Sequence, residues 1–511
     1  MKRIIIRDFK NIPPFGEPAR ELRIMNKPLW LLQRDLLKGY CKTSVEIESY
    51  DEIAEQVPVD DEELIVYRDN LFFNADLIDA FIVAARAYGR PCQIAFLATS
   101  EKYSQKGDLS IEKHALQLQE GIQRRDDARC MKDGAETTTD VYIADIYYFP
   151  GGKRGEPKPL VIDTMSGEMG YYRIPSYMAQ RGDLVYQVPI RAFLSVENWV
   201  HLFFANTPFG VFSWGRSQEL QMSRGRLKDF TKWTSEDWTA FRAKLGLSFT
   251  AFLERLNPFE EKWRNHFLAS KKLVKVGKNC SIDPTAIIHG PTVIGDNVYI
   301  GPGTVIANSL IGNNVNIMQG SQVMLSVVSD RCFLPFNGAL FMTTLMDNSM
   351  VAQNSTLQLC VVGRNTFIGA NNCFTDFNLL GEPIKVLHNG VATEVNMPVL
   401  GSGVGHNVKI GSGFIVYPGR MIGSNTVIIF NNDMNLIRKG TKGLSPDDVD
   451  EATGEPRRVV YHWPNIYNPE SHDNGPPALP EANGHDHSQP MMMQMSAPPV
   501  RVNATLGGKD L

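Results

Sequence analysis

The sequence predicts an α/β domain followed by a parallel β-helix, and two patterns lead to this fold class. Between Val276 and Ile428, an aliphatic residue recurs at every sixth position, and glycine or another small turn residue often follows it. In the first part of the chain, short apolar runs alternate with segments of helical periodicity. A period of six fits neither a helix nor an alternating strand, and it is the signature of hexapeptide coils.

Residues 1–225 are predicted to form the α/β domain. Its strand-like and helix-like segments lie at residues 4–6, 28–38, 63–70, 74–88 and 93–98. The longest helical segment begins near Asn74 and Asp76, residue types that commonly cap helices. Because strand, helix and strand follow one another, we expect a parallel sheet with helices on its faces.

Residues 273–430 are predicted to form the β-helix. Two runs carry the repeat, Ile282, Ile288, Ile294, Ile300 and Ile306 in the first and Val404, Ile410, Val416 and Ile422 in the second. Each hexapeptide supplies one short strand and one turn, and its aliphatic side chain points inward, so that stacked coils bury a continuous apolar column. We expect about seven coils, with a projecting loop at residues 375–398, where the repeat is broken.

Two further segments complete the chain. Residues 226–272 are predicted to be a helical connector, because aromatic residues stand there at helical spacing and are expected to pack between the two domains. Residues 431–511 are rich in Pro, Gly and Met and have little aliphatic content. Such a composition predicts a largely disordered tail.

Composition narrows the class of protein. The net charge is −4 and no basic stripe is interleaved with aromatic residues, so we expect no nucleic-acid partner. No uncharged apolar stretch approaches the length of a membrane span, and the first residues are too soon charged for a signal peptide. The seven cysteines are scattered and form no Cys-x-x-Cys pair, which predicts reduced thiols in a cytoplasmic protein.

Segments from both halves resemble one family. They are residues 25–30 and 64–79 in the α/β part, and residues 380–386, 389–391, 400–411 and 417–423 in the loop and the following coils. The chain resembles the bifunctional sugar-1-phosphate nucleotidyltransferase and acetyltransferase family, whose best-known member makes UDP-N-acetylglucosamine. This resemblance implies a nucleotidyltransferase-like first domain, a left-handed coil and a homotrimer. It also implies a transferase of the sugar-nucleotide class that binds a sugar phosphate or a nucleotide sugar and uses acetyl-CoA or another acyl-CoA, with Mg²⁺.

The chain also departs from the family pattern. The first strand is followed by prolines and by no glycine until Gly16, whereas the family has a Gly-rich phosphate loop there. The family's signature lysine falls on Ala19, and its catalytic histidine falls on or near Gln353, which cannot act as a base. These losses keep a second hypothesis open, in which the chain is a non-catalytic oligomeric scaffold or ligand sensor.

In the first domain, the resemblance places a metal ligand at Asp69 and a substrate-binding residue at Lys27. An Asp followed by an Asn at the end of a strand is able to hold Mg²⁺. The alternative is that Asp69 is a solvated turn residue, because no partner carboxylate is evident.

In the second half, His406 is the candidate catalytic base, since neutral imidazole accepts a proton near neutral pH. It follows the loop directly, so Lys385 and Asn389 are expected to hold the substrate beside it. His289 and His388 are weaker candidates for the same role. The competing interpretation is that His406 is only a turn residue of the coil.

Overall fold

The structure, a computed structural model, describes residues 1–53, 62–114, 119–151, 155–170, 185–217, 273–378, 382–429, 436–437 and 440–462. The predicted connector 226–272 and most of the predicted tail 431–511 lie outside the described residues. Residues 1–474 group into one unit, and all the described residues belong to it.

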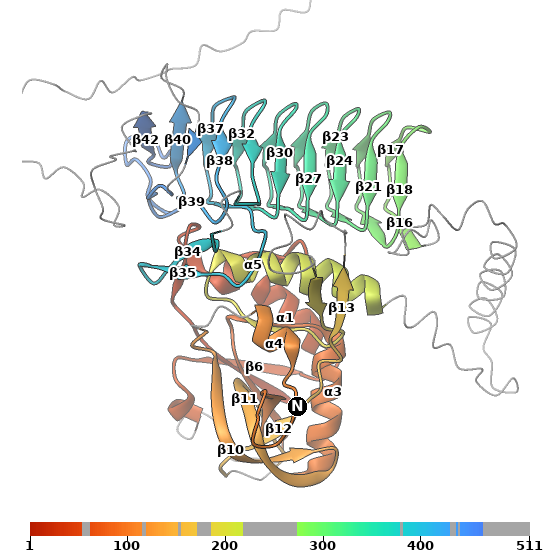
Figure 1. Cartoon of the computed structure of the whole chain (residues 1–511), viewed down its shortest axis with the longest axis vertical. Helices are drawn as coiled ribbons and strands as arrows, with labels where there is room; N and C mark the ends of the chain where they lie inside the picture. The colour runs from red at the N-terminus through yellow and green to blue at the C-terminus, as the bar shows by residue number, and fades with distance from the viewer. Residues whose placement is uncertain are drawn as a thin grey trace, which may run out of the picture. The chain divides into compact units, whose positions relative to one another are not determined.

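A seven-stranded mixed sheet organises the N-terminal part (Figure 1). In sheet order its strands are β10 (Ile122–Lys132), β12 (Lys158–Val161), β9 (Cys92–Leu97), β11 (Ala135–Phe149), β7 (Leu64–Arg68), β1 (Lys2–Ile6) and β6 (Thr43–Ile47). β1 pairs in parallel with β6 and β7, whereas β11 runs antiparallel to both β7 and β9. The expected parallel sheet is therefore mixed, because the antiparallel β11 lies between β7 and β9.

The helices of this part lie close to their predicted positions. α1 (Leu29–Leu37) and α3 (Ala75–Tyr88) correspond to the predicted segments 28–38 and 74–88, and α4 (Leu109–His114) is a short addition. Asn74 caps α3, since its side-chain oxygen accepts a hydrogen bond from the Leu77 N–H at 3.1 Å. The predicted order of strand, helix and strand is confirmed as β7, α3 and β9.

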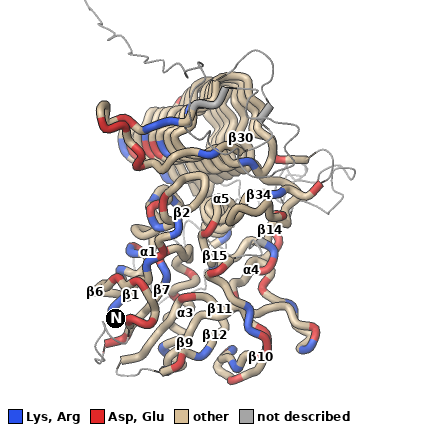
Figure 2. Tube along the Cα trace, turned by 90° about the vertical axis from the view of Figure 1, so that its left-hand side faces the viewer, with Lys and Arg blue, Asp and Glu red and all other residues tan. Residues whose placement is uncertain are grey.

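Short elements complete the N-terminal part. They are β2 (Asn11–Ile12), β3 (Glu17–Pro18), η1 (Ala19–Glu21), β4 (Arg23–Ile24), β5 (Lys27–Pro28), η2 (Tyr50–Glu52), β8 (Leu71–Phe73), β13 (Gly167–Gly170), β14 (Val185–Val188) and β15 (Phe193–Ser195). The long β10 carries Arg and Lys interspersed with Asp, as expected of a solvated face, whereas the charged residues of β11 are all acidic (Figure 2). The loop from β1 to α1 holds five of the short elements, and it contacts the coils.

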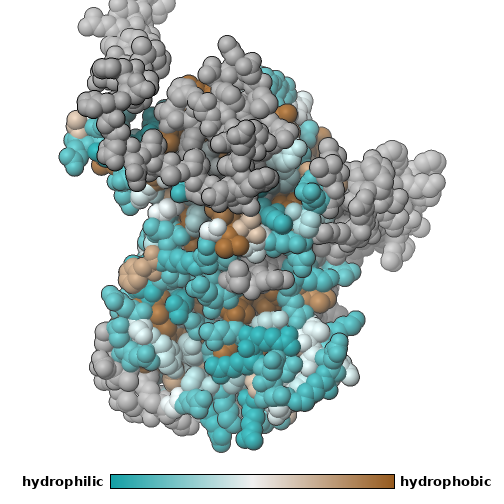
Figure 3. Space-filling model, turned by 60° about the vertical axis from the view of Figure 1, so that its left-hand side comes forward, coloured by the Kyte–Doolittle hydropathy of each residue, from teal (hydrophilic) through white to brown (hydrophobic). Residues whose placement is uncertain are grey.

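Helix α5 (Trp199–Asn206), followed by the π-helical turn η3 (Thr207–Phe212), lies between the sheet and the coils (Figure 1). Every side chain of α5 is buried. One apolar cluster joins α5 to coil residues such as Val327, Val361 and Met421. A space-filling view shows hydrophobic residues at this junction and hydrophilic residues over most of the N-terminal surface (Figure 3). The core between the two halves is therefore continuous.

The second half is a left-handed parallel β-helix of three sheets, which confirms the predicted fold. The first sheet contains β16 (Val274–Val276), β19 (Thr292–Ile294), β22 (Leu310–Ile311), β25 (Val327–Val328), β28 (Thr344–Leu345), β31 (Val361–Val362), β36 (Gly403–Val404) and β39 (Met421–Ile422). The second contains β17 (Ser281–Ile282), β20 (Tyr299–Ile300), β23 (Asn316–Ile317), β26 (Phe333–Leu334), β29 (Met350–Val351), β32 (Phe367–Ile368), β37 (Lys409–Ile410), β40 (Thr426–Ile429) and β42 (Val459–His462). The third contains β18 (Ile287–His289), β21 (Val305–Ala307), β24 (Gln322–Met324), β27 (Ala339–Phe341), β30 (Thr356–Gln358), β33 (Cys373–Phe374), β38 (Ile415–Val416) and β41 (Leu436–Ile437).

The aliphatic column predicted from the repeat is confirmed. Ile294, Ile300, Val404, Ile410 and Ile422 are all buried, in one cluster that runs through the coils. Because β42 pairs with β40, ordered strand structure extends beyond the predicted boundary at residue 430.

Within the projecting loop at residues 375–398, which lies between β33 and β36, two strands form a β-hairpin. Its strands are β34 (Lys385–His388) and β35 (Val391–Glu394), and the turn between them holds Asn389 and Gly390, both with positive φ. Asn-Gly is a residue pair that favours such a turn.

Candidate functional site

A cleft of about 380 Å³ opens where this loop meets the coils. Its lining comes from the start of the loop and from the coil turn after β38, and comprises Asn378, Glu382, Pro383, Ile384, Lys385, Tyr417, Pro418 and Arg420. The volume falls in the range of small-molecule sites. Two cations, one carboxylate, one amide and one phenol therefore surround a space large enough for a small ligand.

Asn198, at the start of α5, holds the buried face of the hairpin, and this orients Lys385. Along β34, Val386 and His388 are buried while Lys385 and Leu387 are exposed. The Asn198 side-chain amide, at the start of α5, donates to the Leu387 carbonyl at 3.1 Å and lies 3.2 Å from His388 Nδ1. Since side chains alternate along a strand, anchoring the buried face leaves Lys385 on the solvent side.

The coil side of the cleft depends on Gly419. Its φ is +72°, and a Cβ on this residue would lie 2.6 Å from the Lys385 carbonyl oxygen. Only glycine therefore allows the coil turn to approach β34 so closely. This approach places Arg420 and Lys385 at the same cleft.

Arg420 is the unusual group of the cleft. Its Nε is buried and makes no hydrogen bond, and neither Arg420 nor Lys385 forms an ion pair with a described residue. Burial lowers the pKa of Arg420, which nevertheless stays charged because the pKa of free arginine is so high. Two cations that form no ion pair with a carboxylate of the described residues make this cleft suited to an anion.

His406 is placed in the interior. Its side chain is 1% exposed, and its ring lies 5.2 Å from that of Phe15, in the β2–β3 segment. The Arg364 N–H donates to Nδ1 at 2.8 Å, and Nε2 lies 3.1 Å from Glu17 Oε1. Because Nδ1 accepts a hydrogen bond, the proton of the neutral ring is assigned to Nε2, which donates it to Glu17.

This bonding pattern uses both nitrogens of His406. Nδ1 holds a backbone N–H and Nε2 already carries a proton, so neither is free to take one from a substrate. Burial also lowers the pKa of His406, although Glu17 opposes this shift. In this arrangement His406 joins the loop of the N-terminal domain to the coils.

Asp69 lies at the end of β7, and its carboxylate is fully engaged. Arg20 Nη1 lies 3.1 Å and Arg7 Nε 3.3 Å from Oδ2, while the Asp8 N–H donates to Oδ1 at 2.8 Å. Both arginines also contact Glu46. Burial raises the pKa of Asp69 to about 6, against the opposing effect of these partners.

The residues around Asp69 do not fit Mg²⁺. A cation at this carboxylate would meet two guanidinium groups within contact distance. Within the described ranges, no group of three His, Cys, Asp or Glu residues is arranged to hold a metal ion. The two guanidinium groups thus occupy the place that Mg²⁺ would need at Asp69.

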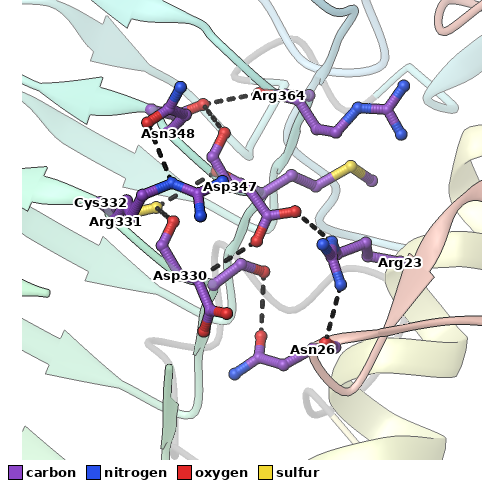
Figure 4. A network of polar contacts seen from close by, with 12 residues as sticks. Arg23, Asn26, Asp330, Arg331, Cys332, Asp347, Asn348 and Arg364 are labelled. Carbon is purple, nitrogen blue, oxygen red and sulfur yellow. Dashed lines mark hydrogen bonds and ion pairs between the residues drawn. The ribbon is translucent and has the colours of Figure 1, made fainter. Parts of the chain in front are cut away.

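Lys27 and Asn389 both lie away from the cleft lining. Lys27 is exposed and paired with Asp35 at 2.7 Å. Its neighbours Arg23 and Asn26 contact the coils (Figure 4). Asn389 is exposed at the hairpin turn, with its side-chain amide 3.4 Å from His388 Nε2. Of the seven candidate residues named from the sequence, which include His289 and His388, Lys385 alone lines the cleft.

The structure adds residues that the sequence did not single out. Arg420 lies within the segment 417–423 that carries the family resemblance. The resemblance therefore pointed to this segment, but it did not indicate that Arg420 lines a cleft. Arg364 and Glu17 form a bidentate ion pair across the two halves of the chain. No local sequence signal indicates that pair, because its members are far apart in the sequence.

Comparison with known proteins agrees with the architecture of the coils. Residues 274–308 match the bacterial transferase hexapeptide family (six repeats). No curated protein sequence matches the chain. Nor does any helix within the described residues combine the length and apolar character needed to cross a membrane.

Two solved structures are similar to parts of the chain. One is the polysialic acid O-acetyltransferase OatWY, with 16% identity over 37% of this chain and 90% of that protein, at a TM-score of 0.16. The other is a Bacillus cereus protein provisionally assigned as an acetyltransferase, with 18% identity over 30% of this chain and 77% of that protein, at a TM-score of 0.15.

Proposed function

We propose that the chain binds a sugar phosphate or a nucleotide sugar in the loop–coil cleft and acts as a transferase of the sugar-nucleotide class. The observation that carries this proposal is the pair of cations, Arg420 and Lys385, which line one cleft without an ion-pair partner among the described residues. A phosphate offers several acceptor oxygens to such groups, and charge-assisted hydrogen bonds to it are strong. The match to the hexapeptide transferases supports the transferase class.

The proposed reaction moves an acyl group from acetyl-CoA or another acyl-CoA to the bound acceptor. Acyl transfer to an amine or hydroxyl needs a base that removes a proton as the thioester is attacked. His406 is committed to Glu17 and Arg364, whereas Glu382 is an exposed carboxylate in the cleft lining. We assign the role of base to Glu382 in this proposal.

Nucleotidyl transfer by the N-terminal domain is proposed to be absent or much weakened. That chemistry depends on Mg²⁺ and on several donors to the triphosphate, because position and charge supply most of the catalysis. Asp69 is held instead by Arg7 and Arg20. A pyrophosphate-release assay with common sugar phosphates and nucleoside triphosphates tests this part, and turnover near 1 s⁻¹, about the low end for ordinary enzymes, would contradict it.

A second candidate function is a non-catalytic oligomeric scaffold or ligand sensor. The burial of His406 and its two hydrogen bonds favour this alternative, because the histidine that the sequence offered as base serves a structural contact. Both candidates share the ligand site, and they differ in whether an acyl group is transferred.

Titration calorimetry of the full chain with glucose 1-phosphate, a uridine diphosphate sugar and acetyl-CoA tests the ligand site. Removing one charged partner of a bound phosphate costs about 1.5–3 kcal/mol, which is roughly 10- to 100-fold in Kd. We expect Arg420→Gln and Lys385→Gln each to weaken binding by this amount. Lys409→Gln, an exposed lysine on β37, is the matched control and should bind as the wild type does.

Release of free CoA thiol separates the two candidates. Turnover that falls in Glu382→Gln while binding persists supports the transferase. Binding without turnover, for any acceptor amine or hydroxyl, supports the sensor. Equal Kd values for the wild type, Arg420→Gln and Lys385→Gln would refute the cleft as the ligand site.

A further inference from the structure

Arg364 and His406 hold the carboxylate of Glu17 in the way that a binding site holds an anion. Arg364 Nη1 lies 2.9 Å from Oε1 and Nη2 lies 2.6 Å from Oε2, which is the two-pronged contact characteristic of guanidinium with an oxyanion. His406 Nε2 adds a third contact at 3.1 Å to Oε1. Both carboxylate oxygens are thus bound by side chains of the coil stack.

The coils fix one of these receptor groups, the His406 imidazole, and the backbone of the other, Arg364, whose guanidinium itself bonds to Glu17. Arg364 follows β31 and His406 follows β36, strands that pair in parallel in neighbouring coils. The Arg364 N–H donates to His406 Nδ1, and the His406 N–H donates to the Ser424 hydroxyl at 2.9 Å. The imidazole therefore keeps its orientation, with Nε2–H directed to the anion, whatever occupies the site.

Glu17, by contrast, is carried on a short segment. It lies in β3, which pairs with β2 through two residues on each side. The carbonyls of Pro14 and Phe15 lie 2.9 and 2.8 Å from the Ser424 hydroxyl oxygen, so this segment rests on the coil turn next to the receptor groups. A pairing of two residues adds little stability of its own.

Other contacts hold the N-terminal domain on the coils independently of Glu17. Arg23 is ion-paired with Asp347, and Asn26 Oδ1 accepts a hydrogen bond from the Ser329 hydroxyl at 2.9 Å. Helix α5 shares its apolar cluster with the coils. Displacement of Glu17 therefore does not require the domain to separate from the β-helix, but release of the whole segment would also expose Ile12 and Phe15, which are buried in the same cluster.

We propose that Arg364 and His406 form an oxyanion-binding site that the chain's own Glu17 occupies, and that a phosphate- or carboxylate-bearing ligand competes with the β2–β3 segment for it. Glu17 stands in for the oxyanion of that ligand. The site differs in residues and location from the loop–coil cleft, so the two are separable by mutation. Occupation by Glu17 keeps the site closed until a competing anion displaces the segment.

The charge states at neutral pH agree with this arrangement. Burial raises the pKa of Glu17, but the hydrogen bonds and charges of His406 and Arg364 outweigh it, so that its pKa lies below the ordinary value. Glu17 is thus an anion at neutral pH. A ligand oxyanion would take over the same hydrogen bonds, and no proton needs to move.

Calorimetry of the full chain with inorganic phosphate and, separately, with succinate tests the proposal. Glu17→Gln keeps the shape of the side chain but removes the charge that competes with the probe. We expect Glu17→Gln to bind phosphate, succinate or both at least about tenfold more tightly than the wild type does. The two probes distinguish a phosphate site from a carboxylate site. Adding Arg364→Met should abolish the gain, whereas adding Lys409→Gln, at an exposed position on β37, should leave it unchanged.

Hydrogen exchange in the wild type gives a second measurement that does not depend on the variant folding. Both probes should speed exchange of the amides of residues 11–18, relative to those of β20, as the probe concentration rises. Equal affinity of Glu17→Gln and the wild type for both probes would overturn the proposal. So would a gain that survives Arg364→Met, or exchange in residues 11–18 that does not respond to either anion.

Discussion

Arg23, in the loop between β1 and α1, is ion-paired with Asp347, in a turn of the β-helix (Figure 4). Asp347 also accepts a hydrogen bond from the Asp330 N–H at 3.2 Å, one coil away. The Arg23 guanidinium donates to the Asn26 carbonyl at 3.1 Å. This pair therefore ties the loop of the N-terminal domain to two neighbouring coils.

Arg23→Met should destabilise the protein by about 2 kcal/mol in urea unfolding. Removing one partner of a buried ion pair costs roughly 3–5 kcal/mol, and we expect less here because Arg23 is partly exposed. Burial already raises the pKa of Asp347, so the unpaired carboxyl can also take up a proton. Arg34→Met, which removes an exposed pair with Asp35, is the control and should change stability by less than about 0.5 kcal/mol. Equal losses of unfolding free energy in the two variants would show that the Arg23–Asp347 pair stabilises the protein no more than an exposed ion pair does.

Gly403→Ala should weaken the packing of α5 on the coils. A Cβ at residue 403 would lie 2.8 Å from Cγ of Trp199, and Trp199 is fully buried. Either the helix or the strand must shift, and such overpacking costs about 1–3 kcal/mol. Gly39→Ala is the matched control, because a Cβ there meets nothing within 4 Å. Thermal unfolding of both variants checks the prediction, and an unchanged Tm for Gly403→Ala would contradict it.

The hexapeptide period revealed the two ends of the β-helix more readily than its middle. Ser281 pairs with Tyr299, 18 residues on, but Tyr299 pairs with Asn316, only 17 residues on. Each middle coil is therefore one residue shorter than the first coil, and the missing residue is at one corner. Across that corner, successive inward-pointing residues are five positions apart in the sequence and not six. Asn308, Leu325, Met342 and Leu359 occupy this corner with positive φ. Leucine and methionine seldom adopt that conformation, so no sequence signal marks the shortened corner.

The candidate site was predictable only in part, for a related reason. Lys385 was identified because it lies in a loop that interrupts the repeat, which is visible in the sequence. Whether His406 is free to act as a base depends on its contact with Glu17, which is 389 positions away in the chain. Docking of one domain on another decides such contacts, and neither spacing nor composition encodes it locally. The same holds for Asp69, whose carboxylate meets Arg20 only because the loop after β1 folds back over the C-terminal end of β7.

The homotrimer remains a prediction from the family resemblance. One outward face of the coils offers a surface for it, since Tyr299, Phe333 and Phe367 are exposed in register on β20, β26 and β32. Apolar surface of this kind often marks an interface. We expect sedimentation of the wild type at three times the chain mass of 57.2 kDa. Phe333→Lys should lower that mass, whereas Val391→Lys, at an exposed position on the hairpin, should not. A wild-type protein of single-chain mass at micromolar concentration would contradict the prediction.

Acid should destabilise the N-terminal domain through His201. This residue is fully buried in α5, its Nδ1 accepts a hydrogen bond from the Glu197 N–H at 3.0 Å, and burial lowers its pKa to about 3. In the unfolded chain the pKa returns to about 6.5, so below that pH the unfolded state binds a proton that the folded state refuses. Stability linked to His201 is therefore complete above about pH 6.5 and is lost as the pH falls toward 3.

His201→Gln tests this directly, because a glutamine oxygen can still accept from the Glu197 N–H while the side chain no longer titrates. Between pH 6.5 and 5 the wild type should lose about 2 kcal/mol of unfolding free energy more than His201→Gln does, at about 1.4 kcal/mol per pH unit. Urea unfolding at pH 7, 6 and 5 measures the difference, and comparing the two proteins cancels contributions from His406 and the carboxyl groups. Parallel pH profiles would mean that His201 is protonated equally in the folded and unfolded states, which its burial without a partner for Nε2 among the described residues argues against.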